Sequence, residues 1–119
     1  MPSRKFPNYL RSARKRSGLS QDEIAFLLGG HNGGKVSRYE RFNRLPSLET
    51  ACVYEALFGV PVSELFAGVF EKVCGKMKKR AELLARKLDV TSRDPSVAQK
   101  LQLFQSVTQP QVIPLSNQS

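Results

Sequence analysis

Apolar residues recur at steps of three and four between Leu10 and Phe66, in five short blocks that turn residues separate. Such steps place side chains on one face of a helix, so each block predicts an amphipathic helix with one face turned inward. The five predicted helices cover residues 8–17, 20–28, 33–42, 47–58 and 61–66. The side chains expected on their inner faces are Leu10, Ala13, Arg14, Ile24, Ala25, Leu27, Leu28, Val36, Tyr39, Leu48, Ala51, Cys52, Glu55 and Phe58.

Capping residues support these helix boundaries and predict an all-α domain over residues 8–68. Ser20-Gln21-Asp22-Glu23 matches a capping box, in which the serine and glutamate side chains satisfy each other's backbone N–H groups. Asn32 and Ser47 can cap the third and fourth helices. Glu55 lies on the apolar face of the fourth helix, so either it pairs with an arginine or this helix is rotated outward; we favour the pair.

A different pattern follows residue 68. Six apolar residues alternate steps of four and three and predict one long amphipathic helix over residues 69–90: Phe70, Cys74, Met77, Ala81, Leu84 and Leu88. We expect this helix to dimerise the chain, and docking on the chain's own domain is the alternative. Within residues 91–119, Asp94-Pro95 can start a short helix, and the tail rich in Gln, Ser and Pro is expected to be flexible and disordered.

Charge narrows the class of partner. The 119 residues include 19 Lys and Arg against 10 Asp and Glu, a formal net charge of +9 at pH 7, and residues 1–7 form a basic arm. This balance favours a polyanion such as nucleic acid, although a membrane surface also fits the charge alone. No apolar run approaches the roughly 20 residues that span a bilayer, and the first residues lack the apolar stretch of a signal peptide. We therefore expect a soluble, cytoplasmic protein with no membrane partner.

Few residues offer catalytic or metal-binding chemistry. Cys52 and Cys74 are too far apart for a zinc motif and are expected to be buried free thiols. His31, the only histidine, has no Cys, Asp or Glu nearby, and Ser20 and Ser47 lack a histidine at a catalytic spacing. We expect no enzyme activity, no metal site and no cofactor.

Four sequence blocks together carry a family resemblance. They are Gly18-Leu19-Ser20-Gln21-Asp22-Glu23-Ile24-Ala25, Val36-Ser37-Arg38-Tyr39-Glu40, Pro46-Ser47-Leu48-Glu49-Thr50 and Phe58-Gly59-Val60. They resemble the phage-repressor and Cro (XRE-like) helix-turn-helix family over about residues 8–67. The resemblance implies a five-helix domain like that of lambda repressor, whose third helix enters the major groove while the second lies against phosphate.

The resemblance also implies which residues meet double-stranded DNA. Gln21 corresponds to a phosphate-contacting glutamine at the positive end of the second helix. Lys35 and Arg38 fall where the family reaches bases or adjacent phosphates, and both side chains suit guanine O6 and N7. Arg14 and Glu40 match positions that form an ion pair between the first and third helices. The candidate DNA-contacting residues are Gln21, Asn32, Gly33, Gly34, Lys35, Ser37, Arg38, Arg41 and Arg44.

The third predicted helix departs from the family pattern at its start. Its first two positions, which often carry polar base readers, are Gly33 and Gly34, and the preceding turn is one residue longer than usual at Gly30-His31. Two interpretations stay open: the backbone N–H groups of Gly33 and Gly34 approach a phosphate, or the two glycines form a flexible cap without a contact.

The predicted function is sequence-specific DNA binding by a homodimer that regulates transcription, with repression by covering a promoter. One alternative is an antitoxin-like protein whose segment 94–107 folds onto a partner protein while the first domain autoregulates its operon. Another is an interaction module that has lost DNA readout through its two glycines.

Overall fold

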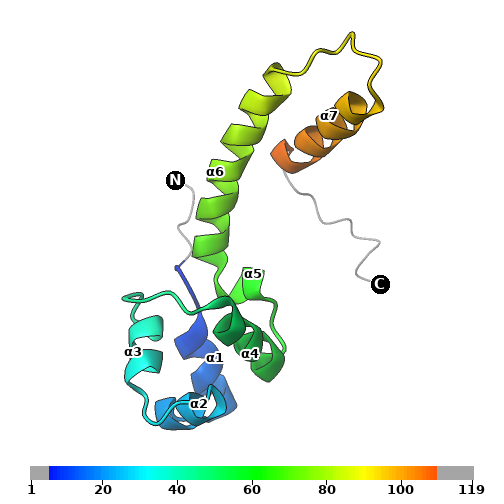
Figure 1. Cartoon of the computed structure of the whole chain (residues 1–119). Coiled ribbons are helices and arrows are strands. Elements are labelled where there is room, and N and C mark those ends of the chain that lie inside the picture. The colour runs from blue at the N-terminus through cyan, green and yellow to red at the C-terminus, as the bar shows by residue number, and fades with distance from the viewer. Residues whose placement is uncertain (1–5, 110–119) are drawn as a thin grey trace, which may run out of the picture. The chain divides into compact units, whose positions relative to one another are not determined.

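The computed structural model describes residues 6–109, and every regular element in that range is an α-helix (Figure 1). The predicted all-α fold is therefore confirmed. The helices are α1 (Leu10–Ser17), α2 (Gln21–Leu27), α3 (Gly34–Glu40), α4 (Leu48–Phe58), α5 (Val62–Leu65), α6 (Ala67–Arg86) and α7 (Pro95–Thr108). Most of the predicted arm and the end of the predicted tail lie outside the described residues. The chain divides into two compact units, Met1–Lys72 and Val73–Ser119.

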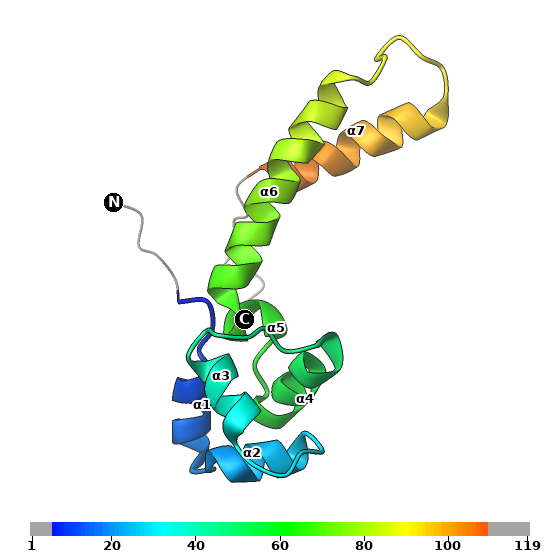
Figure 2. The same cartoon turned by 60° about the vertical axis from the view of Figure 1, so that its left-hand side comes forward.

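Helices α1 to α5 enclose one apolar core in the first unit. α1 packs against both α3 and α4, α2 packs against α3, and α4 packs against α5 (Figure 2). Each of these five helices contributes one side chain that is less than 2% exposed: Leu10, Ile24, Val36, Tyr54 and Leu65. Burial of that extent contributes roughly 1.5–3 kcal/mol for each large apolar side chain, so the five anchors hold the short helices together.

Of the three predicted N-caps in the first unit, Ser20 and Ser47 are present, whereas the N-cap of α3 is Gly33 instead of Asn32. The Ser20 hydroxyl accepts the Glu23 N–H at 3.0 Å, the Glu23 carboxylate accepts the Ser20 N–H at 2.9 Å, and Ser47 accepts the Thr50 N–H at 3.2 Å. α1 begins two residues later than predicted, because the Asn8 side chain accepts the N–H of Leu10. The Asn8 amide also donates to the carbonyl of Tyr39 at 2.8 Å, which joins the start of α1 to the end of α3.

The prediction of which side chains face inward is wrong at four positions. Leu27 on α2 is 48% exposed, and Leu48, Cys52 and Glu55 on α4 are exposed as well. On α4 the buried residues are Ala51 and Tyr54, which are three residues apart. With these two side chains facing the core, the other apolar residues of the helix point away from it. Apolar residues surround α4, so the sequence pattern did not determine its inner face.

Glu55 corrects a second expectation, because it pairs with no arginine. Its carboxylate accepts the N–H of Val62 at 2.8 Å and so satisfies a donor at the first turn of α5. The alternative, an outward rotation of the fourth helix, is the correct one. The predicted burial of both thiols is also wrong, since Cys52 is exposed and Cys74 is half-buried, although both are free.

The described part of the second unit consists of most of α6, the connection over residues 87–94 and α7. α6 ends at Arg86, four residues before the predicted end, and the chain reverses direction before α7 (Figure 1). α7 is longer than the predicted short helix and starts as predicted, with Asp94 accepting the Ser96 N–H at 3.0 Å and Pro95 as its first residue. Of the α6 residues, only Ala81 is buried. Val73, Met77 and Leu84, named the α6 stripe below, are 52%, 42% and 51% exposed.

Tyr54 carries the one buried side-chain oxygen or nitrogen in residues 6–109 that has no hydrogen-bond partner. Burial raises the pKa of its hydroxyl well above 10, and the charge of Glu40 adds to this. The unfolded chain therefore loses this proton first, so the associated stability is present below pH 10 and is lost as the pH rises beyond it. We expect Tyr54→Phe to leave the free energy of unfolding at pH 7 unchanged or to raise it by about 1 kcal/mol.

Urea unfolding at pH 7 and at pH 10.5 checks this expectation. The wild-type chain should lose more stability between the two pH values than Tyr54→Phe. The matched control is Tyr9→Phe, which removes a tyrosine hydroxyl that does not act on the pKa of Tyr54 and should retain the loss at high pH. A strongly destabilised Tyr54→Phe would contradict the expectation, because it would mean that the hydroxyl is stabilising.

Candidate DNA-binding surface

α3 has a sharply divided surface. Val36, Tyr39 and Glu40 are buried in the first unit. Lys35 and Arg38, three residues apart, are exposed and share the opposite face, and Ser37 beside them is half-buried. The structure therefore brings together the two cations that the sequence singled out as base readers and holds them on a helix whose other side is fixed in the core.

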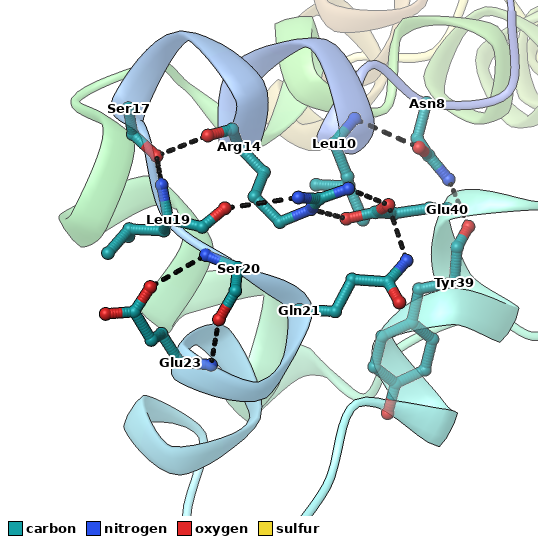
Figure 3. A network of polar contacts seen from close by, with 10 residues as sticks. All are labelled: Asn8, Leu10, Arg14, Ser17, Leu19, Ser20, Gln21, Glu23, Tyr39 and Glu40. Carbon is teal, nitrogen blue, oxygen red and sulfur yellow. Dashed lines mark hydrogen bonds and ion pairs between the residues drawn. The ribbon is translucent and has the colours of Figure 1, made fainter.

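A buried ion pair anchors this helix. Arg14 Nε lies 2.6 Å from Glu40 Oε2, and Arg14 also donates to Glu40 Oε1 at 3.1 Å, so the guanidinium grips the carboxylate at two points (Figure 3). The side chains are only 13% and 2% exposed. The hydrogen bond and the charge of Glu40 raise the pKa of Arg14 above its usual value. Arg14 also donates to the carbonyl of Leu19 at 3.1 Å, which ties the pair to the turn before α2.

Gln21 joins the same network from the first turn of α2. Its Nε2 donates to Glu40 Oε1 at 3.1 Å, so one of its two amide N–H groups faces inward (Figure 3). Glu40 thus accepts from α1 and α2 while it belongs to α3. The contact orients Gln21, and its expected contact with a phosphate stays a prediction, for which the second amide N–H is the donor.

The two glycines at the start of α3 both donate their backbone N–H groups to side-chain oxygens. Gly33 donates its N–H to Asp22 Oδ1 at 2.7 Å, and Gly34 donates its N–H to Asn32 Oδ1 at 2.9 Å. Both N–H groups thus have an acceptor within the chain, and the expected approach of Gly33 and Gly34 to a phosphate stays a prediction. α3 starts one residue later than predicted, with buried Gly33 at its N-cap, and Asn32 satisfies the next donor.

An open cleft of about 640 Å³ lies beside α3 in the first unit. Its lining residues are Arg11, Arg14, Ser20, Gln21, Asp22, Ser37, Glu40 and Arg41. Sequence reasoning did not assign Arg11 and Asp22 to the site, and it expected Ser20 only as a helix cap. Arg11 could have been found from its position three residues before Arg14, which places both on one face of α1. Asp22 gave no local signal, because its partner Gly33 lies beyond the turn.

A short loop with cationic side chains follows α3. Arg41 and Arg44 are exposed, as contact with the DNA backbone requires. Phe42 between them has a φ of 66°, and its ring stacks on Phe6 with centroids 6.3 Å apart. A residue with a side chain adopts this conformation only at a cost, so the stacking and the fixed backbone around it stabilise the shape of the loop.

These features define a class of domain with five short helices. Its third helix exposes cations on its outer face and is held against the second helix by polar contacts. Residues 10–65 match the protein family described as helix-turn-helix. The matching family is of the phage-repressor and Cro type, and its members are DNA-binding regulators. No curated protein and no solved structure matches the chain.

Two features of residues 6–109 concern other kinds of site. None of the helices in this range is both long and apolar enough to cross a membrane. The same range contains no cluster of three or more His, Cys, Asp or Glu side chains that could hold a metal ion.

Proposed function

We propose that the chain is a sequence-specific regulator of transcription that inserts α3 into the major groove of double-stranded DNA and represses by covering a promoter. The observation that carries the proposal is the pair Lys35 and Arg38, exposed together on the outer face of α3 while its inner face is buried. Both side chains match the acceptors O6 and N7 of guanine, so the preferred site contains guanine.

The other cations and amides position the protein on the backbone. Arg41 and Arg44 follow α3 and are exposed, and Gln21 keeps one amide N–H for a phosphate. Asn32 precedes Lys35 in the chain and Ser37 follows it, and both add polar side chains for contact with the DNA. Contacts of this kind fix the register of the protein without reading sequence, whereas Lys35 and Arg38 supply the discrimination.

Self-association is part of this proposal. One small domain touches few base pairs, and members of this structural class read two half-sites with a two-fold dimer. The α6 stripe offers an apolar surface for a second copy, because its three side chains are about half exposed. A homodimer of this kind works in the cytoplasm on a palindromic operator.

Selection of binding sites from a random duplex pool at about 150 mM salt tests the proposal. The full chain should enrich a palindrome with half-sites about one helical turn apart. Lys35→Ala and Arg38→Ala should each weaken binding to that site about 5-fold to 150-fold and relax preference at particular bases. Arg16→Ala, an exposed cation on α1 outside the cleft, is the matched control and should keep the motif. No enriched motif, with weak binding that ignores sequence, would instead favour an interaction module.

A second candidate function rests on the second unit. On α7 no residue is buried, and Leu103 is 59% exposed, so this helix has apolar surface available for another protein. An antitoxin-like regulator would use this segment to fold onto a partner while the first unit controls its own operon. A second small protein that co-purifies with the full chain at a fixed stoichiometry would favour this candidate over the homodimer.

A further inference from the structure

The turn between α2 and α3 is closed by one contact between its two ends. Asp22, in the first turn of α2, accepts the backbone N–H of Gly33 at 2.7 Å, a short distance for such a bond. Gly33 is the N-cap of α3, eleven residues further along the chain. The carboxylate of Asp22 therefore fixes the position at which α3 begins.

The contact between Asp22 and Gly33 requires a glycine at position 33. A Cβ at Gly33 would lie 2.8 Å from the Cβ of Gln21, closer than real Cβ contacts, and 3.0 Å from Asp22 Oδ1, which is a tight contact. The start of α3 thus lies directly on the first turn of α2, and only glycine permits this approach. Gly34 is different, because a Cβ there would meet only Asn32 Oδ1, at 3.0 Å.

Capping of α2 does not account for Asp22. Ser20 and Glu23 already form the capping box of this helix, so the carboxylate of Asp22 is free to serve another element. The negative charge of Asp22 also repels the polyanion that this cleft is expected to face. Its hydrogen bond to Gly33 supplies a reason for the carboxylate at this position.

We propose that Asp22 and Gly33 form a clamp that sets the position of α3 in the groove, with Asp22 as a positioning residue for base specificity. This inference rests on the proposed function. α3 has only seven residues, and its N-cap residue, Gly33, has no side chain that could accept from the first N–H groups of the helix. A shift at its start therefore moves Lys35 and Arg38, one and four residues after Gly34, relative to the base edges. Hydrogen bonds to those edges demand close alignment, so the clamp determines specificity more than affinity.

Two neutral variants separate the clamp from the charge. Asp22→Asn and Asp22→Ala both remove the negative charge, but only asparagine keeps an oxygen that can accept the Gly33 N–H. The measured quantity is the ratio of the Kd for a mixed-sequence duplex to the Kd for the duplex selected by the wild-type chain. We expect this ratio to stay within about threefold of wild type for Asp22→Asn and to fall about tenfold for Asp22→Ala. Affinity for the mixed-sequence duplex should change equally in both variants.

A second readout needs no DNA. The hydrogen-exchange rate of the Gly33 amide in the full chain should rise at least about tenfold in Asp22→Ala and remain near the wild-type rate in Asp22→Asn. Thermal unfolding of each variant confirms that the domain remains folded. Gly33→Ala, which displaces the same backbone sterically, should lower the specificity ratio as Asp22→Ala does, whereas Gly34→Ala should lower it less.

The outcomes distinguish this inference from the function on which it rests. Equal specificity ratios for Asp22→Ala and the wild type would overturn the clamp and leave the DNA-reading function intact. Unchanged exchange of the Gly33 amide in Asp22→Ala would overturn it as well, even in a chain that selects no motif. A wild-type chain without a motif, but with the expected exchange pattern, would overturn the proposed function and the clamp's role in specificity.

Discussion

Replacing Arg14 by methionine is expected to lower the free energy of unfolding of the first unit by about 3–5 kcal/mol. The substitution leaves the carboxylate of Glu40, which is 2% exposed, without its charged partner, and Gln21 alone cannot compensate a buried charge. Small domains have total stabilities of roughly 5–15 kcal/mol, so much of the fold's margin is lost. Urea unfolding followed by circular dichroism measures the effect.

Two companion variants show whether the ion pair is the cause. Arg11→Met changes an exposed arginine one turn earlier on α1 and should alter stability by no more than about 0.5 kcal/mol. The double variant Arg14→Met with Glu40→Leu removes both charges together and should recover most of the loss. A single Arg14→Met that costs less than about 1 kcal/mol would show that the buried carboxylate is stabilised by something other than Arg14.

The affinity for DNA is expected to depend steeply on salt. Five exposed cations of the first unit line the cleft, lie on α3 or follow it in the loop: Arg11, Lys35, Arg38, Arg41 and Arg44. If six to eight phosphate contacts form, log affinity falls with log salt at a slope of roughly −5 to −7, because each contact releases about 0.9 counterion. Between 50 and 200 mM salt the Kd for the selected duplex should then rise by a factor of about 10³–10⁴.

Fluorescence anisotropy over this salt range measures the slope, and charge removal assigns it. The double variant Arg41→Gln with Arg44→Gln should reduce the magnitude of the slope by about 2. Lys79→Gln, which removes an exposed cation of α6, is a control in the second unit. A wild-type slope weaker than about −3 would mean that few cations reach phosphate, and the backbone contacts assigned to the loop after α3 would be wrong.

Most helix boundaries of the first unit could be predicted because short-range sequence motifs determine them. The capping box at Ser20 and the cap at Ser47 lie within four residues of the donors that they satisfy, so spacing alone identified them. The inner face of α4 could not be read in the same way. Leu48, Ala51, Cys52 and Tyr54 surround this helix with apolar surface, and only packing against α1 and α5 selects Ala51 and Tyr54 for burial.

The residues of the candidate surface could be predicted only where the family resemblance assigns a role to their position. Lys35 and Arg38, which the family resemblance placed on the third helix, are exposed together, and Arg14 and Glu40 form the expected buried pair. The role of the two glycines was not accessible. The contact between Asp22 and Gly33 depends on the conformation of the intervening turn, which residue type alone does not determine.

Two backbone hydrogen bonds have a consequence for how this domain is built into longer chains. Tyr9 donates its N–H to the carbonyl of Leu65 at 2.7 Å, and Gly68 donates its N–H to the carbonyl of Phe6 at 3.0 Å. The chain therefore enters and leaves the five-helix domain at neighbouring points. Domains with adjacent ends tolerate insertion and circular permutation, because new segments can be joined there without disturbing the interior. The five helices thus form a module to which different segments can be attached.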